Sequence, residues 1–280
     1  MKNKFQYFNR NLLKWYKKNK RDFTWRCSSD PWKILLIEFL SQQTQLERAD
    51  KYYQFFIKKY PTPEAMARKK KRTVLKDWSG LGYNNRALRL HETSKLISKN
   101  GWKEYSDDFS KLPGVGKYTK SALESFAYKK NVITSDVNVT RVLERYHGRL
   151  ADETWIKENT IQLLGSTNSR YWNQAIMDLS SNICSKSKPK CTLCPIENSC
   201  AKYFSIEQKK KRIESFKGSN REKRGKILKT LIKSRELTFS KAQELIELNQ
   251  KEMLLILETM QKDALVDINK EKKIVILTRK

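Results

Sequence analysis

The sequence has no apolar segment long enough to cross a lipid bilayer. Its longest apolar run, Ile34 to Leu40, is interrupted by Glu38 and is much shorter than the roughly 20 residues that a membrane helix needs. The N-terminal residues contain no apolar core of a signal peptide. We therefore expect a cytoplasmic protein without membrane association, in a reducing compartment where disulfides are rare.

Acidic residues are few relative to basic ones. The 280 residues include 59 Lys and Arg but only 30 Asp and Glu, which gives a formal net charge of +29. Such an excess attracts phosphate polyanions, so the expected partner is nucleic acid and the expected location is the nucleoid. An anionic membrane surface is a distant second, and a basic surface that serves only solubility is the simplest alternative.

Cysteine is also scarce, yet four of the five cysteines lie in one short segment. Cys184, Cys191, Cys194 and Cys200 have the spacing C-x6-C-x2-C-x5-C, whereas Cys27 lies far upstream. Four thiolates on one loop can hold a [4Fe-4S] cluster or a zinc ion. The spacing predicts a metal-bound loop without choosing between the two.

Strand-like patterns are rare before the C-terminal end, and the chain is predicted to be mainly α. Apolar residues recur at helical spacing in Pro31 to Tyr60, Pro63 to Trp78, Arg86 to Asn100 and Lys120 to Tyr128. Turn residues separate these segments. The length allows two or three lobes with cores of their own.

The C-terminal part has a different pattern, which predicts a small winged-helix-like α+β domain. Ten basic residues between Gln208 and Lys229 indicate a charged linker. The order that follows is helix, helix, helix and hairpin. Its predicted elements are a helix around Ile227 to Ile232, a helix capped by Ser240, a helix from Met253 to Met260, and strands at Leu265 to Ile268 and Ile274 to Leu277. Such domains bind DNA or dock a protein partner.

The segment Leu112 to Thr119 contains Gly114 and Gly116 just before a predicted helix. Glycines at such a turn let backbone N–H groups approach a phosphate without side-chain obstruction. This arrangement indicates a phosphate contact without sequence readout. An ordinary turn between two helices is the alternative.

Two carboxyl groups stand out as candidates for chemistry. Glu38 is the only charge in its apolar stretch, and Asp136 lies seventeen residues after Thr119. A carboxyl group in apolar surroundings is expected to have a raised pKa and to hold a proton near neutral pH. An exposed position on a helix surface is the alternative for Glu38.

Residues 5 to 203 resemble the helix-hairpin-helix DNA glycosylases that carry an iron-sulfur cluster, which include endonuclease III and the MutY-type adenine glycosylases. The resemblance is specific because five motifs occur in order. They are Thr24 to Arg26, Glu38 to Gln45, Gly80 to Arg86, Leu112 to Thr119, and the Asp136 segment that leads to the four cysteines. The resemblance implies a two-lobed helix-hairpin-helix core and a [4Fe-4S] cluster on the cysteines.

The same resemblance implies the organisation of the core. Residues 1–205 form the glycosylase core, in which 26–130 make the six-helix lobe with the hairpin, and 1–25 and 131–205 make the cluster lobe. The charge and element pattern of the C-terminal part, and not the resemblance, predicts a basic linker at 206–222 and the winged-helix-like domain at 223–280. The expected DNA contacts of the core are Gly114, Gly116 and Lys117 of the hairpin and Lys186, Lys188 and Lys190 of the loop between the first two cysteines.

The resemblance also assigns roles in excision. Glu38 is expected to protonate N7 of a flipped adenine, and Asp136 to stabilise the positively charged sugar. Gln43 and Tyr83 match residues that fill the gap left by the flipped base. Three further residues, Trp25, Arg26 and Gln174, match the base pocket, although Trp25 is also compatible with a core position and Arg26 with a surface ion pair.

Bifunctional relatives place a lysine in the hairpin where this chain has Tyr118. We therefore expect a monofunctional, monomeric enzyme of base excision repair that acts on duplex DNA with a mispair or damaged base. Adenine opposite 8-oxoguanine or guanine is the favoured target because Gln42 to Gln45, Tyr83 and Trp172 to Asp178 resemble the MutY pattern.

Departures from that pattern keep two alternatives open. Ser41 and Asn84 differ from the usual MutY-type residues, and the C-terminal part looks unlike the Nudix-like domain that helps to recognise 8-oxoguanine. A thymine or uracil glycosylase acting opposite guanine is the first alternative. A DNA-binding protein without catalysis is the second. The C-terminal domain is expected to contact DNA or a protein partner.

Overall fold

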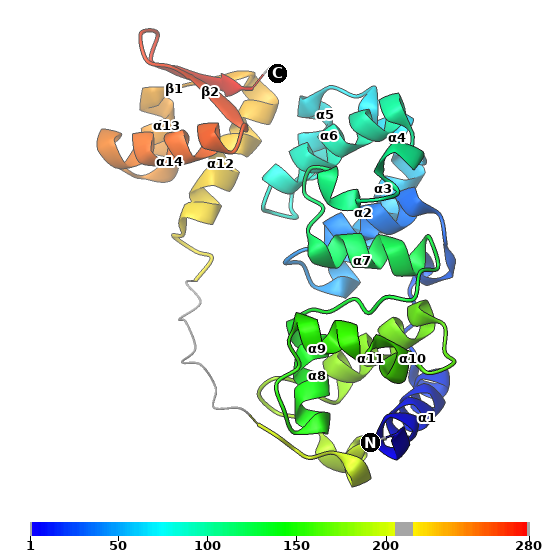
Figure 1. Cartoon of the computed structure of the whole chain (residues 1–280). Helices are drawn as coiled ribbons and strands as arrows, with labels where there is room; N and C mark the ends of the chain where they lie inside the picture. The colour runs from blue at the N-terminus through cyan, green and yellow to red at the C-terminus, as the bar shows by residue number, and fades with distance from the viewer. Residues whose placement is uncertain (1, 205–214, 279–280) are drawn as a thin grey trace. The chain divides into compact units, whose positions relative to one another are not determined.

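The computed structural model describes residues 2–204 and 215–278 and confirms the mainly helical fold with a small C-terminal sheet (Figure 1). The chain divides into two compact units. Unit 1 contains Met1–Phe55, Asp108–Lys111 and Val115–Lys210; unit 2 contains Phe56–Asp107, Leu112–Gly114 and Lys211–Lys280. Among the described residues, no helix combines the length and the apolar character needed to span a membrane.

Unit 1 holds most of the helices that matter for the site. Its elements are α1 (Lys2–Asn19), η1 (Thr24–Cys27), α2 (Pro31–Ser41), most of α3 (Leu46–Lys59), η3 (Phe109–Lys111), α7 (Lys117–Phe126), α8 (Val137–His147), α9 (Glu153–Glu158), α10 (Thr160–Leu164), α11 (Ser169–Asn182), η4 (Cys191–Leu193) and η5 (Glu197–Ser199). The η elements are short 3₁₀ helices. Together these elements bring residues from both ends of the unit into one core.

That core is rich in aromatic side chains from α1, α8 and α11. Phe8, Tyr146 and Trp172 are fully buried, and the ring of Phe8 lies 4.7 Å from that of Tyr146 in an edge-on contact. The indole of Trp172 donates a hydrogen bond of 2.8 Å to the Asn9 side chain, so its polar atom is satisfied inside the core. Helices α8 and α11, which carry candidate site residues, are therefore fixed by a well-packed interior.

Helix α2 is short and almost wholly buried, and its first residue is defined by an N-cap. Asp30 caps it by accepting hydrogen bonds from the backbone N–H groups of Trp32 and Lys33, and Pro31 occupies the first turn, where no N–H is needed. Glu38 is buried within it, and α2 packs against α7. The helical pattern predicted from Pro31 to Tyr60 is two helices, because the chain turns between Ser41 and Leu46.

Unit 2 contains two groups of elements. The first comprises the end of α3 with α4 (Pro63–Ala67), α5 (Lys71–Asp77), α6 (Asn85–Asn100) and η2 (Lys103–Tyr105). Helix α4 packs against α6, and Trp78, which follows α5, is fully buried with an edge-on contact to Phe56. The segment Leu112–Gly114 also belongs to this unit.

The second group has the order expected of a winged helix. It comprises α12 (Asn220–Ser234), β1 (Glu236–Thr238), α13 (Phe239–Ile246), α14 (Gln250–Lys262), β2 (Val266–Asn269) and β3 (Ile274–Leu277). The strands form an antiparallel sheet in the order β1-β3-β2, with Leu237 opposite Val275 and Ile268 also opposite Val275 (Figure 1, yellow to red). Leu231, Met253 and Val275 lie in its core.

Two details of this part differ from the sequence prediction. Strand β1 was not expected, because three residues are too few to show an alternating pattern. Thr238, not Ser240, caps α13: its hydroxyl accepts a hydrogen bond of 3.3 Å from the backbone N–H of Lys241. The linker predicted at 206–222 lies outside the described residues as far as 214, and α12 begins at Asn220.

Candidate active site

Five sequence-predicted residues line one cavity of unit 1. The cavity has a volume of about 280 Å³, and η1, α2, α7, α8 and α11 contribute to its wall. The predicted residues in this wall are Trp25, Arg26, Glu38, Tyr118 and Asp136. Residues from four distant segments of the chain therefore share a space large enough for a small organic group.

Glu38 is a buried carboxyl group in the wall of this cavity. Its exposed fraction is only 5%, and it stands in the last turns of α2 among apolar neighbours. Burial raises the pKa of Glu38 to about 8, and the negative charge of Asp136 contributes in the same direction. The carboxyl group of Glu38 is therefore protonated at neutral pH and can act as an acid.

Asp136 is held in a fixed orientation as the N-cap of α8. Its Oδ1 accepts hydrogen bonds from the backbone N–H groups of Asn138, at 2.9 Å, and Val139, at 2.8 Å. Its Oδ2 accepts a hydrogen bond of 2.8 Å from the Asn138 side chain. These donors fix the orientation of the Asp136 side chain at the start of the helix. Asp136 thus offers a fixed negative charge beside the proton of Glu38.

Tyr118 lies in the first turn of α7 and brings an uncharged side chain to the cavity. Its hydroxyl group donates to the sulfur of Met177 over 3.8 Å. Burial raises the pKa of Tyr118 well above its ordinary value, and the nearby Glu38 and Asp136 add to the shift. The hydroxyl therefore stays protonated and provides no nucleophilic amine where bifunctional relatives have one.

Arg26 is anchored by an aspartate that the sequence did not single out. The two terminal nitrogens of Arg26 each donate a hydrogen bond of 2.7 Å to an oxygen of Asp178, which is fully buried on α11. Arg21 donates to the same carboxylate at 2.7 Å. Burial raises the pKa of Asp178, but the hydrogen bonds and charges of Arg26 and Arg21 outweigh it and lower the pKa overall. Asp178 therefore positions one wall of the cavity.

Three buried donors of the predicted base pocket have unused hydrogen-bonding capacity, and two of them belong to residues that line the cavity. Within the described residues, the Nε1 of Trp25, the Nε of Arg26 and the Nε2 of Gln174 have no hydrogen-bond partner. Gln174 is 6% exposed, and its Oε1 accepts a hydrogen bond of 2.9 Å from Tyr16. Gln174 does not line the cavity, whereas Trp25 and Arg26 do. Buried donors are normally satisfied, so the groups of Trp25 and Arg26 are suited to a polar ligand that supplies acceptors.

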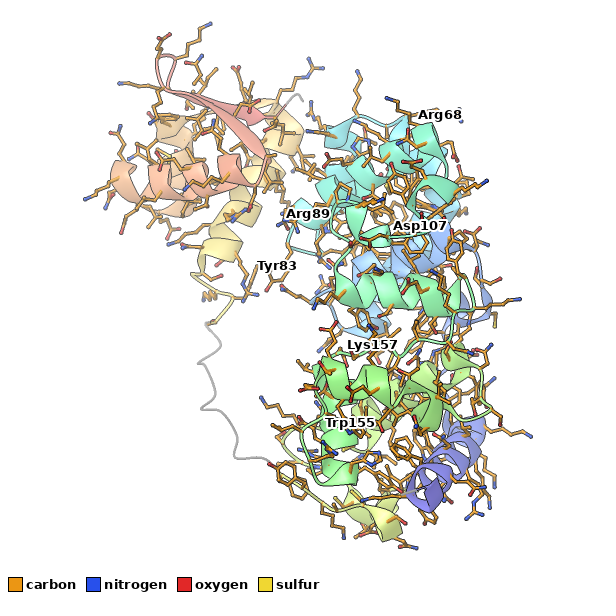
Figure 2. All side chains as sticks on the ribbon, viewed as in Figure 1. Arg68, Tyr83, Arg89, Asp107, Trp155 and Lys157 are labelled. Atoms are coloured by element: carbon orange, nitrogen blue, oxygen red, sulfur yellow. The ribbon has the colours of Figure 1, made fainter. Side chains whose placement is uncertain are left out.

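The two candidate wedge residues have strained backbones. Gln43 is exposed in the turn between α2 and α3 with φ 54°, and Tyr83 is 39% exposed with φ 45° in the loop before α6 (Figure 2). A non-glycine residue in this left-handed region is uncommon and costs free energy, and such strain collects at functional sites. Arg86 secures the second loop by donating to the carbonyls of Leu81 and Gly82.

The hairpin glycines have different geometries. Gly114 has φ 81°, which favours glycine, whereas Gly116 is extended and caps α7. A Cβ added to Gly116 would meet nothing within 4 Å, so its backbone is open to an approaching group. Lys117 is largely exposed and forms an ion pair of 2.7 Å with Glu153, which is also exposed. This end of α7 is therefore accessible to a phosphate.

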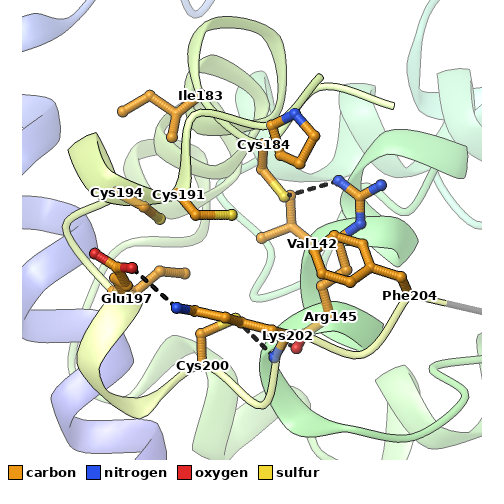
Figure 3. Close-up of a pocket in the computed structure, with 12 residues that line it drawn as sticks. Val142, Arg145, Ile183, Cys184, Cys191, Cys194, Glu197, Cys200, Lys202 and Phe204 are labelled. Atoms are coloured by element: carbon orange, nitrogen blue, oxygen red, sulfur yellow. Dashed lines mark hydrogen bonds and ion pairs between the residues drawn. The ribbon is translucent and has the colours of Figure 1, made fainter. Parts of the chain in front are cut away.

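The four clustered cysteines line a second cavity of unit 1 (Figure 3). None of them forms a disulfide, and Arg145 donates to the sulfur of Cys184 over 3.5 Å. In the described part of the chain, no three His, Cys, Asp or Glu side chains converge closely enough to hold a single metal ion. The four thiols line one space, and thiolates are the donors that both an iron-sulfur cluster and a zinc ion use.

Two arginines of α8 brace the loop that follows Cys184. Arg141 donates a hydrogen bond of 3.0 Å to the Cys184 carbonyl, and Arg145 donates to the carbonyls of Ser185, at 2.7 Å, and Lys186, at 2.9 Å. The side chains of Lys186, Lys188 and Lys190 are exposed on this loop. The loop therefore presents cations to solvent from a fixed backbone.

Helix α8 also connects the two cavities of unit 1. Asp136 caps its start, and the Asn138 side chain that donates to Asp136 accepts a hydrogen bond of 2.9 Å from Arg141. Arg141 in turn holds the Cys184 carbonyl. Sequence reasoning missed these arginines, because a basic residue on a helix gives no signal of its distant partner.

The profile of a known protein family matches the sequence of the central part of the chain. The chain belongs to the HhH-GPD superfamily of base excision DNA repair proteins, whose profile matches residues 36–163. The predicted resemblance to helix-hairpin-helix glycosylases is thereby confirmed. Among curated proteins, the chain is 35% identical over 234 residues to the adenine DNA glycosylase of Mycobacterium tuberculosis, covering 79% of this chain and 77% of that protein. The adenine DNA glycosylase of Rattus norvegicus is 32% identical, covering 72% and 42%.

Solved structures show the same fold. A thermostable thymine-DNA glycosylase superposes with a TM-score of 0.65 and 30% identity, covering 72% of this chain and 97% of that one. A trapped covalent intermediate of endonuclease III with DNA superposes with a TM-score of 0.62 and 22% identity, covering 72% and 96%. The second likeness supports the fold alone, because its sequence identity is low.

Proposed function

We propose that this protein is a monofunctional DNA glycosylase of base excision repair that removes adenine from mispairs, opposite 8-oxoguanine or guanine, by hydrolysis of the N-glycosidic bond. The observation that carries the proposal is the pairing of a protonated Glu38 with Asp136 in one cavity. The relatives named adenine DNA glycosylase support the choice of base.

The chemistry follows from what the bond requires. An adenine inside a duplex is inaccessible, so its nucleotide must rotate out of the stack into the cavity. Glu38 transfers its proton to N7 of adenine, which makes the base a better leaving group. The C1′–N9 bond breaks and its electron pair leaves with the base, while the carboxylate of Asp136 stabilises the positive charge of the sugar. Water adds to C1′ and releases a proton.

The wall of the cavity supports a hydrolytic reaction without strand cleavage. A lyase step needs an amine that attacks C1′ and forms a Schiff base. The described lining residues of this cavity include no lysine, and Tyr118 occupies the hairpin position. The enzyme is therefore expected to leave an intact strand with an abasic site.

We assign recognition of the base to buried side chains whose N–H groups lack a hydrogen-bond partner. We assign contacts with the duplex to exposed residues. Trp25, Arg26 and Gln174 supply buried donors that need acceptors. The wedge role belongs to Gln43 and Tyr83, which fill the space left by the flipped base. The backbone contacts are proposed at Gly114, Gly116, Lys117, Lys186, Lys188 and Lys190, within a core of residues 1–205.

We assign a [4Fe-4S] cluster to the cysteine cavity, an assignment supported by the four cysteines that line it and by the family. Cys184, Cys191, Cys194 and Cys200 would hold it as thiolates, and Arg145 would donate toward Cys184. When bound, the cluster would link the four cysteines through metal–thiolate bonds and so close the loop that carries the exposed lysines. Purified protein should be brown, absorb broadly near ~400 nm and contain iron, whereas a colourless protein with stoichiometric zinc would contradict this assignment.

A thymine or uracil glycosylase acting opposite guanine is the second candidate. The likeness to a solved thymine-DNA glycosylase at 30% identity favours it. A pyrimidine has no N7, so Glu38 would instead orient water or polarise the base. The two candidates therefore differ in the role of one proton.

The test uses four duplexes that differ only in one pair. They contain A opposite 8-oxoguanine, A opposite G, T opposite G and U opposite G, and each is treated with alkali after incubation. The proposal predicts cleavage of the adenine strand only after alkali. Release of thymine or uracil alone would favour the second candidate, scission before alkali would contradict a monofunctional enzyme, and tight binding without cleavage would contradict both enzymes.

A further inference from the structure

The C-terminal part of the chain has a very uneven distribution of charge. Helix α12 carries six basic residues and one acidic residue, whereas α14 carries two of each. In winged-helix proteins that read DNA, the third helix enters the major groove, and here that helix is α14. The helix in the reading position is therefore the less suitable of the two for contact with a polyanion.

The exposed face of α14 has further features that disfavour a groove. Leu255 is 58% exposed, and Glu252 is exposed beside it. Glu258 forms an ion pair of 3.8 Å with Lys270 of the turn between β2 and β3, which reduces the positive charge of that turn. Acidic and apolar side chains on this surface repel or fail to match phosphates and base edges.

Helix α12 presents the opposite arrangement. Ile227, Leu228 and Leu231 are buried on one side of the helix. On the other side, Lys226, Lys229 and Lys233 are exposed at spacings of three and four residues, which places them in one row. We call these three residues the α12 lysine row. Lys226 forms an ion pair of 3.7 Å with Glu222 of the same helix, so the positive charge of the row lies mainly on Lys229 and Lys233.

The length of this row suits a phosphate backbone. Seven residues of helix separate its ends, which corresponds to about 10 Å along the axis. A DNA duplex presents one charge for each ~1.7 Å of its axis, so several phosphates lie within that length. Gly225 lies on the same side, and an added Cβ there would meet nothing within 4 Å. A backbone can therefore come close to this side of the helix.

We propose that the C-terminal domain binds the phosphate backbone of duplex DNA through the α12 lysine row, and that α14 does not read a groove. The contact is independent of sequence because it involves charge alone. It adds a contact between the enzyme and the DNA backbone outside the position of the base that is removed. The partner is double-stranded DNA, and a protein partner is an outcome of the test.

The experiment compares two double variants of the full-length protein with equal charge changes. The first is Lys229→Glu with Lys233→Glu on α12, and the matched control is Lys251→Glu with Lys262→Glu on α14. Binding of a short, undamaged, fluorescein-labelled duplex is measured by anisotropy over a series of salt concentrations. Because the duplex is undamaged, the result does not depend on base release or on the proposed excision chemistry.

The α12 variant should bind about ten-fold more weakly near ~0.1 M salt, and its slope of log K against log salt should fall by about 2, since two phosphate contacts are lost. The α14 variant should stay within about two-fold of the parent. Equal losses in both variants would show only the effect of net charge and would overturn the proposal. A larger loss in the α14 variant would point to groove reading, and no loss in either would point to a protein partner; both overturn it.

Two further measurements test whether the variants stay folded and whether charge alone explains the loss of binding. Both variants should melt at the temperature of the parent, because all four lysines are exposed. If charge reversal unfolds the α12 variant, Lys229→Gln with Lys233→Gln takes its place. Lys229→Arg with Lys233→Arg keeps the charge and should retain the parent's affinity and salt slope.

Discussion

Glu38 and the α12 lysine row show how the same kind of residue, a charged side chain, acts in opposite ways when it is buried and when it is exposed. Glu38 is 5% exposed, and burial raises its pKa to about 8. The lysines of the row are exposed, and water screens their charges. Burial therefore converts a charge into a proton donor, whereas exposure leaves it as part of a long-range field.

The difference predicts different sensitivities. Chemistry at a buried group depends on a single proton and on atoms within hydrogen-bonding distance, so one substitution should have a large effect. Binding at an exposed row is shared among several charges and depends on salt, so each substitution should have a modest effect. The variants below test that distinction from the largest expected effect to the smallest.

Glu38→Gln should have the largest effect. The amide fills the same space but cannot donate the proton, so single-turnover release of adenine should fall by about 10³-fold or more. Affinity for an undamaged duplex should stay within about two-fold of the parent, since Glu38 lies inside the cavity. Unchanged release would remove Glu38 from the acid role.

The stability of the same variant gives an independent check of burial. The folded protein keeps the proton of Glu38 up to about pH 8, whereas the unfolded chain releases it near the ordinary value of 4.5. The unfolded state therefore binds fewer protons in this range, and the free energy of unfolding of the parent falls as pH rises from about 4.5 to about 8. Above that range, Glu38→Gln should melt at a higher temperature than the parent.

Asp136→Asn should have the next largest effect. The amide loses the negative charge that stabilises the sugar, so release should fall by about 10²-fold to 10³-fold. One side-chain oxygen remains to accept from the N–H groups of Asn138 and Val139, so the cap of α8 is largely kept and stability should change by about 1 kcal/mol or less. A folded variant with parental activity would contradict the electrostatic role.

The paired charge reversals on α12 and α14 come third. The expected ten-fold loss of affinity in the α12 variant is far smaller than the loss of rate at Glu38, because neighbouring cations remain. A loss of affinity as large as about 10³-fold would mean that the row includes a desolvated contact and would weaken the contrast between buried and exposed charge.

Gly225→Ala should have the smallest effect, a change in stability. The direction of that change tests how closely α12 is packed at this point. Alanine is favoured over glycine within a helix by about 0.5–1 kcal/mol, and the added Cβ meets no atom within 4 Å. Thermal melting should therefore show a small gain in stability. A loss of stability would show that α12 is packed more closely at this point than its exposed face indicates.

Much of the candidate site was predictable because its residues carry local signals. A lone carboxyl group in an apolar run predicted a buried Glu38, and the structure places it in one cavity with Asp136, Tyr118, Trp25 and Arg26. The mainly helical fold was predictable from apolar residues at helical spacing. These signals are properties of short segments.

The remaining features depend on contacts between distant segments. Asp178 binds Arg21 and Arg26 across more than 150 positions of sequence, and Arg141 reaches Cys184 from another helix. No periodicity records such pairs, because each residue looks like an ordinary charge on a helix surface. Strand β1 escaped prediction because it is short and is defined by its pairing with β3.

The most direct test of the account is the pH dependence of adenine release under single-turnover conditions, followed from about pH 6 to about pH 10 with the duplex saturated by enzyme. Because Glu38 must be protonated and its pKa is about 8, the rate constant should be level at neutral pH and fall about ten-fold per unit above that value. Glu38→Gln should show no such fall. A rate that rises with pH through 8, or a fall that is retained in Glu38→Gln, would contradict a buried, protonated Glu38 as the acid.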